Sequence, residues 1–322
     1  MRVARTVALG QTRIEEAPDP ACGPGDVVCR VLACATCGSD VQDTYVAPKL
    51  PAVLGHEPAG EVVQVGRDVH GIAAGDRVAI HHHAPCGACP RCRAGHETLC
   101  ERYRASGLDP GGFAEYVLVP ADLVGELQAL DGLDPVAATC TEPLGCAIRA
   151  VARVGVRPGQ SLLVAGAGCS GLLNIAAARA RGVADVRVRE PDAGRRARAL
   201  AWGAREHADG EIVDAAIVCT SKPAAVRDAA AALGPGGHLC LYAPLAPGEP
   251  LGVDGWDVFT RELTVTASWS AGPADMRAAL ALLRDGAVPT DELITARYPL
   301  EQTGAALAAQ REGKVLKAVV LP

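Results

Sequence analysis

The pattern of apolar and polar residues changes character partway along the chain. Up to about residue 140, short apolar runs separated by glycine and proline predict extended strands at residues 26–33, 59–65, 76–82 and 113–119. From residue 161, apolar runs at 162–165, 186–188, 215–219 and 238–242 alternate with alanine-rich helical stretches at 172–181, 195–202 and 224–233. Because parallel strands need crossover connections, this alternation predicts a parallel sheet with helices on both faces.

The C-terminal part of the chain contains one more helical pattern. Met276, Ala279, Leu280 and Leu283 recur at the spacing of one helix face, and Gly286 can end that helix. We therefore predict an α/β protein with two domains. Residues 1–143, completed by 271–322, form a β-rich domain, and residues 144–270 form a doubly wound Rossmann domain. The active site is expected between them, near the carboxyl ends of the parallel strands.

Composition narrows the class of protein. In a chain of 322 residues, 49% are hydrophobic and 21% charged, which is typical of a globular protein and excludes a disordered one. The formal charge of -6 gives no electrostatic reason to bind nucleic acid or an anionic membrane. The first residues lack a secretory signal, so we expect a cytoplasmic protein. Thirteen cysteines, an odd number, in a reducing compartment favour metal binding over disulfides.

Four cysteines lie close together in the first half of the chain, at Cys86, Cys89, Cys92 and Cys100. This spacing lets a short loop wrap four sulfurs around one Zn²⁺, and four sulfur ligands leave no open position for a substrate. We predict a structural zinc site. The alternatives are free loop cysteines or a nucleic-acid-binding ribbon, and the acidic charge balance argues against the ribbon.

A second, mixed set of candidate ligands precedes this loop. Cys37 is followed 19 residues later by His56 and Glu57. A catalytic zinc typically has three protein ligands and one coordination position left for water, and a thiolate, an imidazole and a carboxylate match this pattern. On these residues alone the metal interpretation is weak, because a single histidine or cysteine beside an apolar strand is more often a packed side chain. The run His81–His83 is expected not to chelate as a run, because neighbours on a strand point to opposite faces, although one of the three could still line the pocket.

A glycine-rich loop, Gly166-Ala167-Gly168-Cys169-Ser170-Gly171, lies between a predicted strand and a predicted helix. This G-x-G-x-x-G pattern predicts a dinucleotide site with the pyrophosphate at the helix N-terminus. Glu190, 19 residues beyond the loop, can accept hydrogen bonds from the adenosine ribose and repel a 2′-phosphate, which favours NAD. NADP remains the alternative because three arginines are close in sequence, namely Arg189, Arg195 and Arg196. Cys169 and Ser170 indicate altered packing near the pyrophosphate, or a redox role for the thiol.

Together, the motifs resemble the zinc-containing medium-chain alcohol dehydrogenases. The resemblance is carried by Gly55-His56-Glu57-Pro58-Ala59-Gly60 with Gly66 and Val69, by Cys37, and by the four-cysteine loop, in the order in which that family has them. It covers essentially the whole chain. It implies a GroES-like catalytic domain, a homodimer or homotetramer, and a catalytic zinc surrounded by Cys37, His56 and Glu57.

The resemblance also assigns roles to residues that the patterns leave open. It implies that Glu142 reaches the metal directly or through water, as in the polyol and threonine dehydrogenase branch. The alternative is an acid favoured at a helix N-terminus. It further implies that Ser39 relays the alcohol proton, although a serine bonding local turn backbone is as good an interpretation. Where relatives often have histidine, this chain has Gln42, which cannot titrate.

The resemblance places three further residues at the cofactor. Arg195 and Cys219 are expected beside the dinucleotide, and Lys317 is expected to reach its pyrophosphate. For Lys317, an exposed, solvated lysine is the alternative.

We therefore expect hydride transfer between NAD and a polar secondary alcohol, such as a polyol, cyclitol or sugar derivative, in a protein with one catalytic and one structural zinc. A second interpretation is an NADPH-dependent reductase of a biosynthetic ketone or aldehyde. A third is a zinc protein that binds nucleotides without turnover, and the presence of Cys37, His56 and Glu57 together argues against it.

Overall fold

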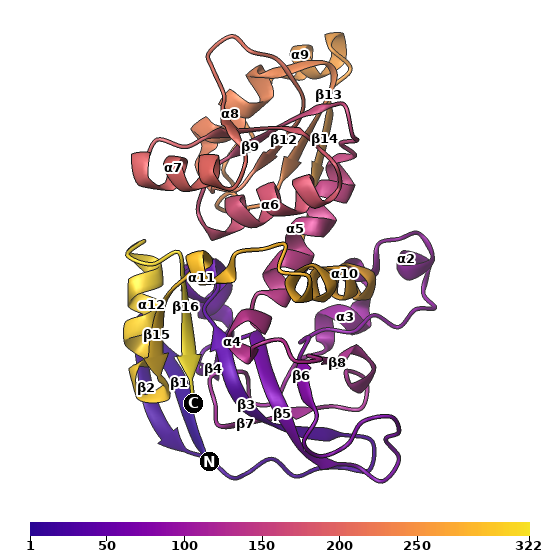
Figure 1. Ribbon diagram of the computed structural model, residues 1–322, viewed down its shortest axis with the longest axis vertical. Helices are drawn as coiled ribbons and strands as arrows, with labels where there is room; N and C mark the ends of the chain where they lie inside the picture. The colour runs from indigo at the N-terminus through magenta and orange to yellow at the C-terminus, as the bar shows by residue number, and fades with distance from the viewer. The chain divides into compact units, whose positions relative to one another are not determined.

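The computed structural model describes residues 1–322 and divides into two compact units. Unit 1 comprises Met1–Glu142 and Gly272–Pro322, and unit 2 comprises Pro143–Ala271. Each unit has its own sheet and its own apolar core, and both are drawn in Figure 1. None of the helices has the length and apolar character needed to span a bilayer.

Unit 2 is built on a six-stranded sheet in which every strand pair is parallel. The strand order is β11-β10-β9-β12-β13-β14. The bounds are β9 (Ser161–Ala165), β10 (Asp185–Arg189), β11 (Arg205–Glu206), β12 (Val213–Val218), β13 (Leu233–Leu241) and β14 (Thr264–Ala267). All five residues of β9 are buried, as expected for a central strand covered on both faces. This strand order is that of a doubly wound fold and confirms the predicted Rossmann architecture.

The helices of unit 2 flank this sheet (Figure 1). They are α5 (Thr141–Val154), which begins in unit 1, α6 (Cys169–Ala180), α7 (Ala193–Ala201), α8 (Pro223–Ala231) and α9 (Gly255–Thr260). One predicted boundary is wrong. The helix expected at 224–233 ends at Ala231, and β13 begins at Leu233 rather than at 238. The glycines and proline at 234–237 do not interrupt this strand, because an irregular register lets Leu233 pair with Val213 before regular pairing resumes at His238.

Unit 1 is mostly β, as predicted. Its larger sheet has the order β15-β16-β3-β5-β6-β8, with β7 also paired to β3, and a second sheet has the order β2-β1-β4. The bounds are β1 (Arg2–Ala8), β2 (Gln11–Glu16), β3 (Val27–Ala35), β4 (Ala52–Val53), β5 (Glu57–Val65), β6 (Arg77–Ala79), β7 (Tyr116–Val119), β8 (Gln128–Ala129), β15 (Ile294–Pro299) and β16 (Lys317–Leu321).

The helices of unit 1 are short except for two near the C-terminus. These are α10 (Pro273–Arg284), which matches the predicted face, and α12 (Thr303–Arg311), which runs beside β15 and β16 in Figure 1. The others are α1 (Asp43–Val46), α2 (Pro90–Arg93), α3 (Glu101–Ala105), α4 (Pro135–Ala138) and α11 (Thr290–Leu293). The chain therefore returns to unit 1 after residue 271, and β16 becomes an inner strand of its larger sheet.

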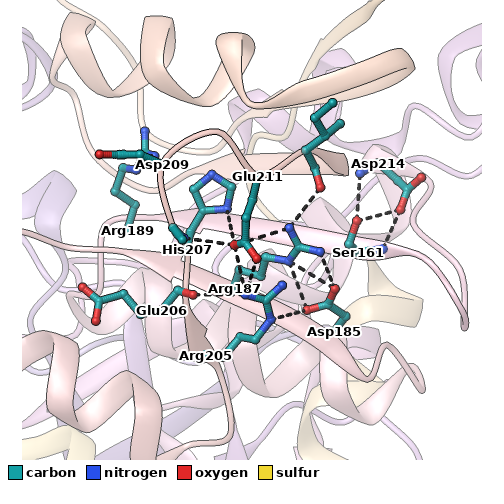
Figure 2. A network of polar contacts seen from close by, with 12 residues as sticks. Ser161, Asp185, Arg187, Arg189, Arg205, Glu206, His207, Asp209, Glu211 and Asp214 are labelled. Atoms are coloured by element: carbon teal, nitrogen blue, oxygen red, sulfur yellow. Dashed lines mark hydrogen bonds and ion pairs between the residues drawn. The ribbon is translucent and has the colours of Figure 1, made fainter.

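A network of charged side chains lies around β10 and β11 in unit 2 (Figure 2). The Arg187 side chain, 11% exposed, donates to Asp185 Oδ2 at 2.6 Å and to the Ile212 carbonyl oxygen at 3.0 Å. Arg205 bridges the Asp185 and Glu211 carboxylates at 3.0 Å and 2.9 Å. Hydrogen bonds from Arg205 lower the pKa of Glu211 to about 2, and those from Arg187 lower the pKa of Asp185.

We expect the substitution Arg187→Met to lower the free energy of unfolding by about 1–3 kcal/mol at pH 7, because it leaves the Ile212 carbonyl without its side-chain donor and leaves Asp185 with Arg205 alone. Arg205→Met, which removes a more exposed partner of the same carboxylates, should cost at most about 1 kcal/mol. The difference between native and Arg187→Met proteins should shrink as the pH falls from about 4.5 toward 2. Carboxylates with lowered pKa stabilise the fold above that range and lose this contribution on protonation. Urea unfolding at pH 7 and pH 3 measures both effects, and a difference independent of pH would contradict the ionic origin.

Candidate functional site

Strand pairing in unit 1 brings together three segments that are far apart in sequence. Ala35, the last residue of β3, pairs with Glu57 at the start of β5 on one side and with Val319 of β16 on the other. Cys37 follows Ala35 by two residues, and Lys317 is the first residue of β16. The register of one strand therefore sets the positions of a thiol, a carboxylate and an ammonium group.

The predicted mixed ligand set is assembled in this corner of unit 1. One ligand atom each from Cys37, His56 and Glu57 lies within 4.8 Å of the other two. Glu57 is 1% exposed, and its Oε1 is buried without a hydrogen-bond partner. A buried, unpartnered carboxylate oxygen beside a thiol and an imidazole is what a divalent cation would satisfy, so these residues fit a zinc ion.

Asp40 ties two of these residues together. Its Oδ2 accepts a hydrogen bond from the Cys37 backbone N–H at 2.9 Å, and its Oδ1 lies 3.2 Å from His56 Nδ1. Burial, the largest single cause, lowers the pKa of His56, but the charges and hydrogen bonds of Asp40 and Cys37 together outweigh burial and raise this pKa. Holding Nδ1 in this way orients the ring and leaves Nε2 for a metal. No role was predicted for Asp40, although an acid three residues after a loop residue is a recognisable turn signal.

Ser39 lies beside the same imidazole. Its Oγ is 3.4 Å from His56 Nε2, the nitrogen that Asp40 leaves free. The turn-serine interpretation predicts a bond from this hydroxyl to local backbone, whereas the observed partner is 17 residues away in sequence. The hydroxyl therefore reaches the ligand set.

Lys317 occupies a different place from the one expected. Its Nζ lies 2.5 Å from Glu57 Oε2 and donates to the Thr36 carbonyl oxygen at 3.1 Å. The side chain is 2% exposed, so the exposed-lysine alternative is wrong. The expectation that Lys317 contacts the pyrophosphate is also corrected, because Glu57 and the Thr36 carbonyl bind the Lys317 ammonium group. Burial raises the pKa of Glu57, and the Lys317 charge opposes that rise.

Glu142 lies near this set but outside the group of three. It is in the first turn of α5 and is 6% exposed. Its charge contributes to the raised pKa of Glu57, which places the two carboxylates near each other. The three ligand atoms within 4.8 Å of one another do not include one from Glu142. Whether it reaches a metal directly or through water stays a prediction.

The histidine run departs from the expected alternation. β6 ends at Ala79, so His81, His82 and His83 lie beyond the strand. The His82 and His83 rings have centroids only 4.0 Å apart, and the His82 centroid is 5.0 Å from that of His56. The expectation that neighbours point to opposite faces is wrong here, because it holds only for extended, paired backbone.

The four-cysteine loop also gathers its thiols. Cys86, Cys89, Cys92 and Cys100 offer sulfur atoms within 4.8 Å of one another, and all four are free. The sulfur atoms of Cys89 and Cys92 are 3.5 Å apart. A hydrogen bond from the Cys86 backbone N–H lowers the pKa of Cys100 to about 6. Four thiols lie close together, and backbone N–H donors lower the pKa of one of them. This arrangement fits a zinc site with four sulfur ligands.

The glycine-rich loop of unit 2 has the geometry that its sequence predicts. Gly166 has φ +97°, which an L side chain rarely adopts. A Cβ on Gly171 would lie 1.9 Å from the Gly166 carbonyl oxygen, so only glycine fits. Gly168 precedes the first turn of α6, which Cys169 and Ser170 begin, and a Cβ there would meet nothing within 4 Å. The open backbone at this helix N-terminus fits a pyrophosphate.

Glu190 follows β10 and faces this loop. Its Oε2 accepts a hydrogen bond from the Ala167 N–H at 2.7 Å, and its Oε1 accepts from the Asp192 N–H at 3.0 Å. Arg195 lies in the first turn of α7, where its N–H is capped by Asp192 at 2.8 Å. Cys219 follows β12, and its thiol accepts from Asn174 Nδ2 at 3.5 Å. Burial raises the pKa of Cys219, so this thiol is protonated.

Comparison with known proteins agrees with this geometry. The alcohol dehydrogenase GroES-like domain matches residues 23–129. The L-threonine 3-dehydrogenase of Pyrococcus furiosus is 33% identical, over 98% of this chain and 99% of its own. The chain belongs to the zinc-containing medium-chain alcohol dehydrogenases. The sorbitol dehydrogenase of Bacillus subtilis is 31% identical, over 97% of this dehydrogenase and 94% of its own chain. The crystal structure of a zinc-binding dehydrogenase from Sinorhizobium meliloti, bound to NADP, has a TM-score of 0.90 at 29% identity and covers 100% of this chain and 99% of its own.

Membership confirms the predicted family, the fold class and the general activity, which is that of a zinc-dependent alcohol dehydrogenase. The GroES-like match spans Cys37, His56, Glu57 and the whole four-cysteine loop. A small-molecule alcohol is therefore the substrate class of this dehydrogenase.

Proposed function

We propose that this dehydrogenase transfers a hydride between a polar secondary alcohol, such as a polyol, cyclitol or sugar derivative, and NAD. The proposal rests chiefly on the meeting of Cys37, His56 and Glu57 within 4.8 Å of one another. Unit 1 would be the catalytic domain and unit 2 the dinucleotide-binding domain. The naming of one relative as a sorbitol dehydrogenase supports a polyol, and that of another as a threonine dehydrogenase supports a polar secondary alcohol more generally.

Cys37, His56 and Glu57 would hold the catalytic zinc, with Glu142 as a further ligand or as a ligand to its water. When bound, zinc supplies the positive charge that lowers the pKa of an alcohol. Asp40 orients His56 and braces the Cys37 backbone. Lys317 compensates the buried charge of Glu57 and fixes the position of that carboxylate.

Ser39 is the group placed to accept the alcohol proton at its Oγ. Gln42, three residues further on, has no titratable group, so the proton must leave through water or another side chain. This route differs from a histidine-terminated relay.

Unit 2 would bind NAD through the loop from Gly166 to Gly171 and through Glu190. Two of the three arginines that would favour a 2′-phosphate have other partners. Arg189 lies 3.2 Å from Asp209, and Arg196 donates to the Glu190 carbonyl oxygen at 2.7 Å. The Glu190 carboxylate itself would repel a phosphate.

We expect Glu190→Gln to shift the ratio of kcat/KM for NAD over NADP toward NADP by about 10-fold or more, because the substitution removes a charge near the ribose and keeps the side-chain shape. The glutamine oxygen can keep the bond from the Ala167 N–H in the loop, whereas the bond from the Asp192 N–H is lost. Asp192→Asn, a change of the same kind at the cap of α7, serves as the control. Steady-state kinetics with both cofactors measure the ratio, and an unaltered ratio would remove Glu190 from cofactor selection.

The second candidate is an NADPH-dependent reductase of a ketone or aldehyde. One specific observation favours it: the Sinorhizobium meliloti relative was determined with bound NADP. Cofactor preference and the relative rates of oxidation and reduction discriminate the two candidates.

Cys86, Cys89, Cys92 and Cys100 would hold a second, structural zinc. We also propose a homodimer or larger homo-oligomer. β14 is the last strand of its sheet, and exposed apolar residues flank it in sequence: Trp256 (71% exposed) and Phe259 (78%) in the preceding helix α9, and Trp269 (43%) two residues after the strand. Apolar side chains of this size beside a sheet edge support burial against a second copy.

A spectrophotometric panel tests the proposed function. Polyols, cyclitols, amino alcohols, ketones and aldehydes are assayed with NAD, NADP and their reduced forms on protein of measured zinc content. The expected result is fastest reduction of NAD with a polyol or cyclitol. Absence of cofactor reduction with every alcohol, in protein carrying zinc, would contradict it and favour a non-catalytic role.

A further inference from the structure

His82 stands beside the candidate metal ligands without belonging to them. Its ring centroid lies 5.0 Å from that of His56, within the range of roughly 4.5–7 Å typical of ring pairs in contact. The two neighbouring histidines have identified structural partners. His81 Nε2 lies 3.3 Å from the Tyr103 hydroxyl, and His83 Nδ1 lies 3.0 Å from the Ser106 carbonyl oxygen.

His82 has an unused hydrogen-bonding atom at this position. Its Nδ1 is buried and has no hydrogen-bond partner. Buried polar atoms in native proteins are nearly always paired, so an unpaired one calls for an explanation such as a catalytic role or a bound ion or water. The Nδ1 atom itself is buried, whereas the side chain as a whole is partly exposed, so a small molecule can approach other atoms of the ring.

The hydrogen-bonding chemistry of an imidazole suits a hydroxyl group. A neutral imidazole offers one donor and one acceptor. A hydroxyl group can both donate and accept, so it can pair with either ring nitrogen.

We propose that His82 is a specificity-determining residue, which binds a second hydroxyl on the carbon next to the one that is oxidised. This inference rests on the proposed function and names its substrate class more narrowly as vicinal diols. The reacting oxygen of the substrate is directed to the set formed by Cys37, His56 and Glu57. The neighbouring oxygen of a vicinal diol then reaches the His82 ring, which packs against His56. A monohydric alcohol leaves His82 without this partner and is disfavoured for that reason.

The substitution His82→Phe tests the proposal, because phenylalanine retains a ring of similar size and removes both nitrogens. We expect kcat/KM for 2,3-butanediol to fall by about 10- to 100-fold, the effect of losing a hydrogen bond to a buried group, and mainly through KM. Activity with 2-butanol should change by less than about threefold. His82→Asn, which restores a donor and an acceptor, should recover part of the preference for the diol. Zinc analysis of each variant excludes loss of the metal as the cause.

Direct binding gives a readout that does not depend on turnover. Saturation-transfer NMR on the zinc-loaded protein without cofactor should detect 2,3-butanediol with native protein and not with His82→Phe, whereas 2-butanol should give the same weak signal with both. If the native protein oxidises no alcohol, the proposed function fails, and this binding difference still decides the role of His82.

Three outcomes would overturn the inference. Equal losses with diol and monohydric alcohol would show a structural role for the ring. Unchanged kcat/KM with each of the two substrates would show that His82 does not contact the substrate. A preference for a hydroxy acid that is lost in Lys49→Met and kept in His82→Phe would assign recognition to the Lys49 ammonium, which lies 3.3 Å above the Tyr45 ring in the same region.

Discussion

Replacing Cys37 with serine is expected to lower turnover by at least about three orders of magnitude. The thiol is one of three candidate ligands whose atoms lie within 4.8 Å of one another. A hydroxyl is a far weaker zinc ligand than a thiolate, so the serine variant should lose the metal. The metal stabilises charge in the transition state by several kcal/mol, and each loss of about 1.4 kcal/mol of this stabilisation lowers the rate tenfold. Initial rates with the best alcohol of the panel, together with zinc content, measure the effect.

The matched control for this experiment is Cys22→Ser. Cys22 is a half-buried free cysteine whose thiol donates only to local backbone carbonyls, at 3.7 Å and 3.4 Å. Its replacement should leave the rate within about twofold and the zinc content unaltered. Full activity of the Cys37→Ser protein, at unchanged zinc content, would refute the proposed ligand set.

The second large effect is expected at the four-cysteine loop. Cys100→Ser should remove one zinc per chain and lower the melting temperature by about 10 °C. Structural zinc binding contributes about 10–16 kcal/mol to the folding of small zinc domains. In a chain of this size, a loss of even a few kcal/mol lowers Tm by several degrees. Cys100 is 1% exposed, and its low pKa suits it to bind as a thiolate. Calorimetry and metal analysis measure the two quantities.

Ala88→Ser provides the control within the same loop, since Ala88 is exposed and lies between two of the cysteines. It should keep both the zinc and the melting temperature. If Cys100→Ser melted as the native protein does while its zinc content fell, the metal would have no structural role. If the zinc content did not change, Cys100 would not be a ligand.

Local patterns were sufficient for the motifs whose function depends on close sequence spacing. Gly166 is required by a positive φ in a tight turn, and Gly171 because a Cβ there would lie 1.9 Å from the Gly166 carbonyl oxygen, so both constraints act within six residues. The four cysteines lie within one loop, so their meeting also follows from spacing alone. The parallel sheet was likewise predictable, because its buried strands appear as continuous apolar runs.

Long-range pairing was not predictable in the same way. β2 and β15 are half-exposed strands with few consecutive apolar residues, and neither was predicted. The side chains of His81–His83 were predicted to point to alternate faces of a strand. That prediction requires a paired strand, but β6 ends at Ala79. The neighbourhood of His82 therefore became visible only in three dimensions.

By itself, the sequence determined the two-part architecture, the glycine loop, the cysteine loop and the candidate set of Cys37, His56 and Glu57. Only the tertiary structure decided that Lys317 binds Glu57 instead of a pyrophosphate, that Asp40 orients His56, and that His82 packs against that ring. The physical reason is register. Ala35 pairs with both Glu57 and Val319, and the pairing of residues nearly 300 positions apart depends on the whole sheet rather than on local spacing.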